Sequence, residues 1–225
     1  MTNLFLSGGG DEIQTKDIDQ AFVQSINKHK PMLYIPIAMD EKHIPYESCY
    51  EWITNAFKSI GVNHITMWTD LCGKSLEDLQ GVSSVYIGGG NTFSLLHELT
   101  QTGFIDVLSL YIAKGGIVYG GSAGAIVLGK DIRTCAHMDT NKIGLKMTEG
   151  LNLVDEYAIW CHYHPEQDEL IHTYQKDYQQ NVIALTEETG LKITEQGIKV
   201  IGSKKAYCFS REGKSVLEVS HYINI

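Results

Sequence analysis

A serine flanked by glycines lies at a predicted strand-to-helix turn. The segment Gly120-Gly121-Ser122-Ala123-Gly124 follows an apolar run at 116–119 and leads into another at 123–128. In such a turn a strained backbone exposes the hydroxyl at the end of a strand, and small neighbours let a substrate approach. The first amides of the following helix then face a developing negative charge. We predict that Ser122 is a nucleophile with the Ala123 amide in its oxyanion hole; the alternative is a serine that only caps the helix.

A second glycine run could complete that oxyanion hole. The segment Gly88-Gly89-Gly90-Asn91-Thr92 follows the apolar strand at 85–87 and precedes a predicted helix. Amides without side chains at this edge of the sheet can donate to an oxyanion, and we expect Asn91 and Thr92 to contact the substrate. The alternatives are a phosphate-binding loop and a plain turn.

A serine hydroxyl needs a base, and nine histidines compete for that role. His162 and His164 follow an apolar strand at 157–161, and Pro165 comes directly after His164. Because α/β sheets place their sites where strands end, we predict that His164 is the base. His162 shares its face at period two and is interpreted as a structural or supporting residue.

The base in turn needs an acid that orients it. Glu187 follows the apolar strand at 182–185 and is the predicted third member; Glu188 is an alternative, because a register error of one residue would exchange the two. A metal site is the other interpretation of this part of the chain, with the ligands His162, His164, Asp168 and Glu169. Neither an HExxH motif nor a set of thiolates supports it, and we expect no metal and no cofactor.

Short apolar runs alternate with amphipathic stretches through the first 130 residues, which is typical of a parallel sheet covered on both faces. The predicted strands lie at 4–6, 32–37, 64–69, 84–87 and 116–119, and the predicted helices near 17–28, 46–60, 92–113 and 123–129. Further on we predict a strand at 157–161, a helix at about 166–179 and several short strands that form a hairpin-rich C-terminal edge. We expect one α/β domain over residues 1–225.

Composition narrows the class of protein. The net charge of −9 repels phosphate backbones and argues against nucleic acid as a partner. Five cysteines without a CxxC pair argue against a disulfide framework and favour a reducing compartment. The sequence shows neither a signal-peptide pattern nor an apolar run long enough to span a membrane. We therefore expect a cytoplasmic protein without a membrane partner.

The chain resembles the peptidase E family of serine peptidases, the aspartyl dipeptidases, and more distantly cyanophycinase. The matching segments are Leu4 to Gly10, Tyr86 to Phe93, Gly120 to Ala125, 132–134, the strand that ends at His164, and Ala184 to Glu187. The resemblance implies a flavodoxin-like α/β fold, a three-layer sandwich with a mostly parallel central sheet. The resemblance also implies that this fold is related to that of class I glutamine amidotransferases, which carry cysteine where Ser122 stands in the strand-to-helix turn. It also implies a triad in the chain order Ser, His, Glu, unlike that of α/β-hydrolases.

The resemblance further implies cleavage after an N-terminal aspartate, whose carboxylate needs a cation. Arg133 lies in a matching segment, and we expect it near the substrate; the alternative is a solvated surface arginine. His137 stands where the family has an aspartate, and Asp139 follows two residues later. We expect both to contact substrate, and the lost carboxylate would change how the substrate amine is held.

Together these features predict a serine exopeptidase that hydrolyses small peptides through an acyl-enzyme, as a monomer or homodimer. One alternative is a related hydrolase of isopeptide, amide or ester substrates, and another is a binding protein without turnover. A third is nucleotide binding through Gly8-Gly9-Gly10, although the third glycine of a dinucleotide motif would fall at Ile13.

Overall fold

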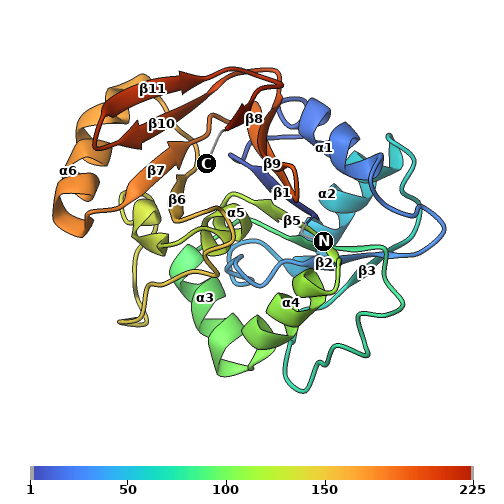
Figure 1. Cartoon of the computed structure of the whole chain (residues 1–225). Helices are drawn as coiled ribbons and strands as arrows, with labels where there is room; N and C mark the ends of the chain where they lie inside the picture. The colour runs from blue at the N-terminus through green and yellow to red at the C-terminus, as the bar shows by residue number, and fades with distance from the viewer. Residues whose placement is uncertain (1–2, 224–225) are drawn as a thin grey trace.

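The computed structural model describes residues 3–223, which form two β-sheets and the helices packed against them (Figure 1). The larger sheet has eight strands in the order β12-β9-β8-β1-β5-β4-β2-β3. Its parallel strands are β1 (Asn3–Ser7), β2 (Met32–Ile35), β3 (Ile65–Met67), β4 (Ser84–Ile87) and β5 (Ile117–Gly121). Three antiparallel strands extend it: β8 (Thr189–Thr194), β9 (Gly197–Gly202) and β12 (Tyr222–Ile223).

Alternate residues of the central strands face opposite helical layers, because successive side chains of a strand point to opposite faces. One layer contains α1 (Lys16–Val23) and α2 (Tyr46–Lys58), and the other contains α3 (Thr92–Gln101), α4 (Phe104–Ala113) and α5 (Ala123–Leu128). Phe5 packs in the core beneath the first layer, whereas Leu4 and Leu6 pack in the core beneath the second. The predicted three-layer α/β architecture is confirmed.

The structure differs from the prediction in two places. The helix expected over 92–113 is divided into α3 and α4 at Gly103, whose φ of 70° lies outside helical geometry. A second sheet, which we did not predict, has the order β11-β10-β7-β6 and packs against α6 (Asp168–Tyr178). Its strands are β6 (Tyr157–Trp160), β7 (Asn181–Ala184), β10 (Ala206–Ser210) and β11 (Gly213–Leu217). The antiparallel pairs β8–β9 and β10–β11 form the predicted hairpins.

A carboxylate is buried between α1 and the central sheet. Asp19 is 6% exposed and accepts hydrogen bonds from the Tyr119 hydroxyl and the Thr15 hydroxyl, both at 2.7 Å. Burial raises the pKa of Asp19 from its ordinary 3.8 to about 6, against the opposing effect of these two hydrogen bonds.

The buried carboxylate predicts a pH-dependent stability. The folded state holds the Asp19 proton more tightly than the unfolded state does. Protonated Asp19 therefore stabilises the fold below pH 4, and this stabilisation is lost as the pH rises through 6. A shift of this size corresponds to about 3 kcal/mol. The free energy of unfolding in urea is measured for the wild type and for Asp19→Asn at pH 4 and pH 7. The comparison isolates the effect of Asp19, because the variant cannot titrate at this position. An equal difference in unfolding free energy between the two proteins at both pH values would contradict the prediction.

Candidate active site

Ser122 lies at the turn between β5 and α5 with a strained backbone, φ 49° and ψ −110°. The flanking glycines allow this turn to pack closely. A Cβ on Gly120 would lie 2.4 Å from the Gly124 carbonyl oxygen, and one on Gly124 would lie 2.3 Å from the Ile87 carbonyl oxygen. Ser122 itself is partly exposed and lines a cavity. The turn therefore has the geometry of a nucleophile elbow.

The imidazole beside Ser122 belongs to His162. The Ser122 Oγ lies 2.9 Å from His162 Nε2, and His162 Nδ1 lies 2.9 Å from Glu187 Oε1. His162 follows the end of β6 with a left-handed φ of 51°, and its amide donates to the Gly8 carbonyl at 2.9 Å. These contacts turn the ring towards the elbow.

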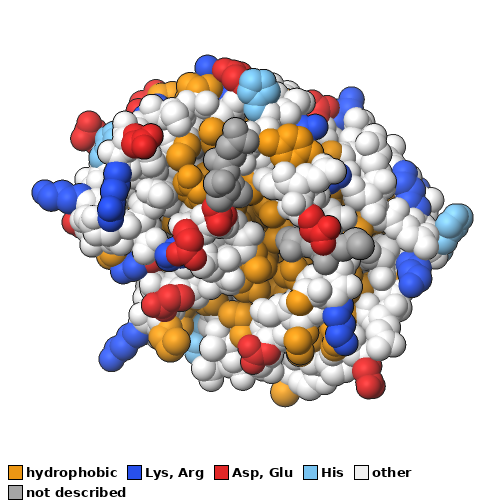
Figure 2. Space-filling model, viewed as in Figure 1, with side chains coloured by type: hydrophobic (Ala, Val, Ile, Leu, Met, Phe, Trp, Pro, Cys, Tyr) orange, Lys and Arg blue, Asp and Glu red, His pale blue; other side chains and the backbone are white. Residues whose placement is uncertain are grey.

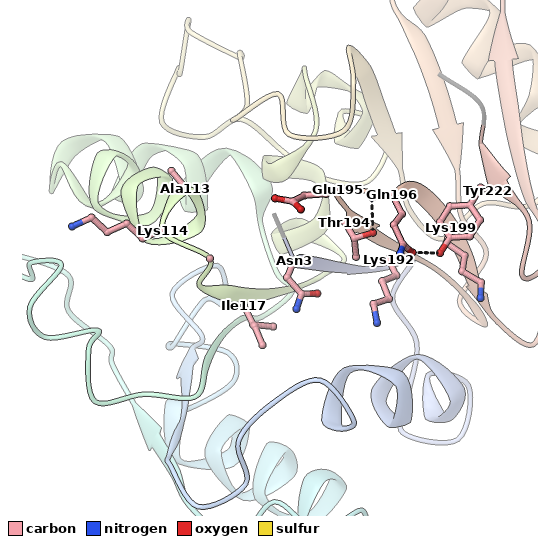
Figure 3. Close-up of a pocket in the computed structure, with 11 residues that line it drawn as sticks. Asn3, Ala113, Lys114, Ile117, Lys192, Thr194, Glu195, Gln196, Lys199 and Tyr222 are labelled. Atoms are coloured by element: carbon pink, nitrogen blue, oxygen red, sulfur yellow. Dashed lines mark hydrogen bonds between the residues drawn. The ribbon is translucent and has the colours of Figure 1, made fainter. Parts of the chain in front are cut away.

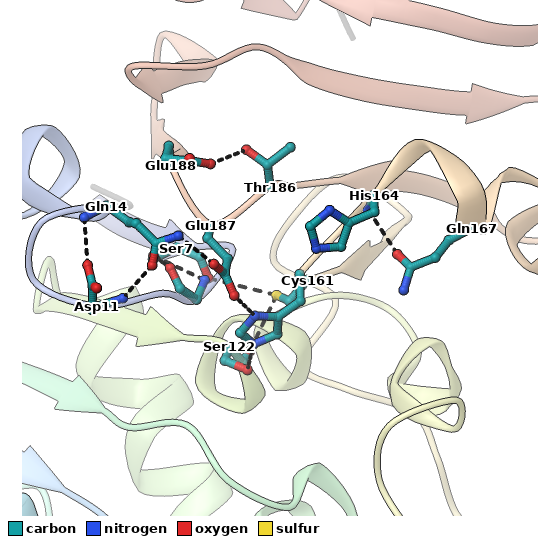
Figure 4. A network of polar contacts seen from close by, with 12 residues as sticks. Ser7, Asp11, Gln14, Ser122, Cys161, His164, Gln167, Thr186, Glu187 and Glu188 are labelled. Carbon is teal, nitrogen blue, oxygen red and sulfur yellow. Dashed lines mark hydrogen bonds and ion pairs between the residues drawn. The ribbon is translucent and has the colours of Figure 1, made fainter.

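The prediction that His164 lies beside Ser122 is wrong. His164 is exposed, and its amide donates to Gln167 Oε1 at 3.0 Å; both residues lie apart from Ser122 in Figure 4. The period-two argument assumed that the strand continues through residues 162–164. The positive φ of His162 breaks that extended geometry, so the two histidines do not share a face.

Glu187, and not Glu188, faces the histidine. Its second oxygen, Oε2, accepts a hydrogen bond from Gln14 Nε2 at 2.5 Å, a contact that the sequence analysis did not anticipate. The hydrogen bond with His162, followed by that with Gln14, lowers the pKa of Glu187 despite partial burial. Glu188 instead pairs with Lys204 Nζ at 3.0 Å.

The glycine run after β1 makes room for these side chains. Gly9 has a φ of 107°, and a Cβ built on it would lie 2.1 Å from His162 Cε1. A Cβ on Gly10 would lie 2.9 Å from the Glu187 Cβ. Gly9 and Gly10 therefore leave space for the side chains of His162 and Glu187, which is a different role from a nucleotide-binding loop. A glycine run at the end of a central strand is the signal in the sequence that could have indicated it.

The second glycine run, Gly88 to Gly90, also approaches Ser122. A Cβ on Gly89 would lie 3.3 Å from the Ser122 Cβ and 3.8 Å from its Oγ. The Gly88 amide, in contrast, donates to the Ile35 carbonyl at 3.0 Å and is already engaged. Gly90, with a φ of 134°, packs against the Ala38 carbonyl. Of the three donors predicted in this run, Gly89 lies closest to Ser122.

A cavity of about 410 Å³ begins at Ser122, Gly89 and His162. It extends towards β2, β4 and α2, and most of its walls are apolar or aromatic; they include Tyr34, Met39, Ile44, Cys49, Trp52 and Tyr86. A space of this size fits a small ligand or the side chain of one residue. None of these wall residues was identified from the sequence.

The side chains expected to contact substrate do not line this cavity. Asn91 caps α3 by accepting from the Ser94 amide at 2.9 Å and donates to the Thr140 carbonyl at 3.0 Å. Asp139 accepts from the Thr92 amide at 2.8 Å at the same helix end. These three residues attach the loop around residue 140 to the start of α3, which is a structural role.

Arg133 and His137 also have other partners. The Arg133 guanidinium forms a salt bridge with the buried Asp131 and lies 3.7 Å over the Tyr178 ring, so the expectation of a substrate contact is not supported. The guanidinium is therefore already paired with the buried Asp131 carboxylate and does not offer an unpaired positive charge to a substrate carboxylate. The His137 ring stacks on Trp160 at 4.3 Å, and burial lowers its pKa.

The described residues show no arrangement for a metal ion. Within residues 3–223, no group of three His, Cys, Asp or Glu side chains could hold one. Asp168, a ligand of the alternative metal site, instead binds Lys214 Nζ at 2.7 Å and the Tyr163 hydroxyl at 2.6 Å. Over the same residues, no helix has the length and hydrophobicity to cross a membrane.

A larger cavity of about 750 Å³ lies away from the elbow (Figure 3). Asn3 and Ile117, the first residues of β1 and β5, line it together with Lys192, Lys199 and Tyr222. It therefore opens at the amino ends of the strands, whereas α/β sheets place their sites at the carboxyl ends. In Figure 2, which shows one face of the molecule, hydrophobic side chains gather in the centre and charged ones lie mostly around them.

Comparisons with known proteins agree with one another. The model of peptidase family S51 matches residues 4–201. An uncharacterized peptidase of Listeria monocytogenes, Lmo0363, is 31% identical over 169 residues, which cover 72% of this chain and 78% of that protein. A peptidase E of Nostoc sp. is 29% identical over 193 residues, 80% of this chain and 76% of that protein.

Solved structures agree with this match. The crystal structure of a peptidase E candidate from Listeria monocytogenes EGD-e has a TM-score of 0.72 and 26% identity, and the match covers 91% of this chain and all of that one. A peptidase from an acI-B1 Actinobacterium has a TM-score of 0.76 at 18% identity, with coverage of 100% and 97%, and shows the shared fold alone.

Proposed function

Because the chain belongs to peptidase family S51 and is a serine peptidase, we propose that Ser122, His162 and Glu187 form its catalytic triad and that it removes N-terminal residues from small peptides. The observation that supports this proposal is the unbroken series of contacts from the Ser122 Oγ through both ring nitrogens of His162 to Glu187. The chain order Ser, His, Glu is the one that the resemblance implies, with His162 in place of His164.

The geometry suits proton transfer by the histidine. Glu187 accepts from Nδ1, which keeps that nitrogen protonated and leaves Nε2 free to take the Ser122 proton as the Oγ attacks the carbonyl carbon. The lowered pKa of Glu187 keeps it ionised, so it can stabilise the imidazolium that forms.

Two amides are placed to receive the negative charge of the tetrahedral intermediate. Ala123 is the first residue of α5, and its N–H has no acceptor within the helix. Gly89 follows the carboxyl end of the neighbouring parallel strand β4 and approaches Ser122 from that side. When the intermediate collapses, the C–N bond breaks and His162 returns its proton to the leaving amine. Water then attacks the acyl-enzyme, with His162 as base, and releases Ser122.

Covalent labelling together with peptide cleavage tests this proposal. We expect a fluorophosphonate to label the folded protein at Ser122, located by peptide mapping, and not the heat-denatured protein, because only the folded site activates the hydroxyl. The purified protein should also release the first residue from a panel of di- and tripeptides, followed by mass spectrometry. A folded protein whose Ser122 stays unlabelled and which cleaves no peptide would contradict the proposed triad.

A further inference from the structure

The walls of the cavity at Ser122 carry no positive charge. Among the described residues that line it, none is Lys or Arg. Apart from His162, its ionisable lining groups are Tyr34, Tyr86 and Cys49, and burial raises the pKa of each of them. These three groups are therefore neutral at ordinary pH.

Two of the side chains that line the cavity are hydrogen-bonded to acids behind its walls. Thr15 lines the cavity and donates to Asp19, and His162 lines it and contacts Glu187. The Arg133 guanidinium, which could have balanced a carboxylate, is paired with Asp131. A substrate carboxylate in this cavity would lose water without gaining a partner of opposite charge, which is unfavourable.

The mouth of the cavity exposes large apolar side chains. Ile44 is 44% exposed and Trp52, on α2, is 38% exposed, and both line the cavity. Tyr34 and Tyr86 pack edge to face at 5.7 Å deeper inside. An apolar substrate group that enters would bury the two exposed side chains and contact the two rings, which is favourable.

We infer that this cavity binds the side chain of the residue that acylates Ser122, and that it selects a large uncharged residue, aromatic or aliphatic, over aspartate. The inference rests on the proposed function. The acyl carbon would be bonded to the Ser122 Oγ with its oxygen towards Gly89, and both residues line the cavity, so the attached side chain has its space there.

Aminoalkyl diphenyl phosphonates test the selection directly, because they phosphonylate an activated serine and carry the side chain of one chosen residue. We expect the phenylalanine and leucine analogues to inactivate the protein at least about tenfold faster than the aspartate analogue, as second-order rate constants. A pair of variants separates charge from size. Ser48 is exposed on α2 and lines the cavity, and Ser48→Arg adds a cation there, whereas Ser48→Gln adds length alone. Ser48→Arg should raise the rate with the aspartate analogue, and Ser48→Gln should not.

The outcomes distinguish the inference from the proposed function. If the aspartate analogue reacts as fast as the others or faster while Ser122 is labelled, the inference is overturned and the triad stands. Equal changes in Ser48→Arg and Ser48→Gln would also overturn it, because charge would then have no role. If neither the phosphonates nor a fluorophosphonate labels Ser122, the proposed function fails and the inference fails with it.

Discussion

Replacement of Ser122 by alanine is expected to lower kcat for peptide hydrolysis by about 10⁴- to 10⁶-fold, because the loss of one member of a cooperating triad removes most of what the triad contributes. Alanine keeps the Cβ and the backbone strain of the elbow, and it loses only the hydroxyl that contacts His162. The thermal unfolding midpoint should therefore stay close to that of the wild type. The measurement is release of the N-terminal amino acid under saturating peptide, with fluorophosphonate labelling in parallel.

Activity of Ser122→Ala within about tenfold of the wild type would contradict Ser122 as the nucleophile. A variant that has lost activity together with its folded structure would be uninformative by itself. Ser122→Cys provides the matched control, because it keeps a nucleophilic atom at the same position and should react with a thiol-directed reagent when the site is intact.

The two histidines predict opposite results for the same substitution. His162→Ala should lower kcat/KM by about 10⁴-fold or more, because Ser122 would lose its base, whereas His164→Ala should change it by less than about threefold. The His164 side chain is exposed, and the contact with Gln167 uses its backbone amide, which alanine keeps. Both variants are compared by kcat/KM and by the rate of fluorophosphonate labelling, with circular dichroism to check the fold.

The reverse pattern, with His164 essential and His162 dispensable, would contradict the proposed triad. A large loss in both variants would mean that the segment is sensitive as a whole. His162→Gln distinguishes these cases: it retains a hydrogen-bonding side chain near Ser122 but no group that can take the proton, so it should be as inactive as His162→Ala.

The local elements around Ser122 were predictable because their signals are close in the sequence. An apolar strand, two glycines, a serine and a short apolar helix occupy residues 116–128, and the structure contains β5, the elbow and α5 there. Glu187 follows β7 at the end of an apolar run. The flavodoxin-like fold, similar to class I glutamine amidotransferases, is confirmed by the resemblance to the structures of a peptidase E candidate and of a second bacterial peptidase.

The cavity at Ser122 was not predictable in this way, because its walls come from β2, β4 and α2, which are distant in the sequence from Ser122. Arg133 illustrates the difficulty. Its segment matches the family, and its positive charge suits a substrate carboxylate. In the structure, however, its guanidinium forms a salt bridge with the buried Asp131, two residues earlier. Sequence proximity to a motif did not show which partner the guanidinium would have.

The sequence by itself determined most of the strands along the chain and the elbow with Ser122, because each depends on residues that are neighbours in the chain, and it narrowed the acid after β7 to Glu187 or Glu188. Only the tertiary structure decided between His162 and His164. The backbone reverses its geometry at residue 162, where φ is 51°, and the ring enters a space that Gly9 leaves open 153 residues earlier. A contact between segments so far apart depends on how strands pair across the sheet, which a period-two pattern within one strand does not contain.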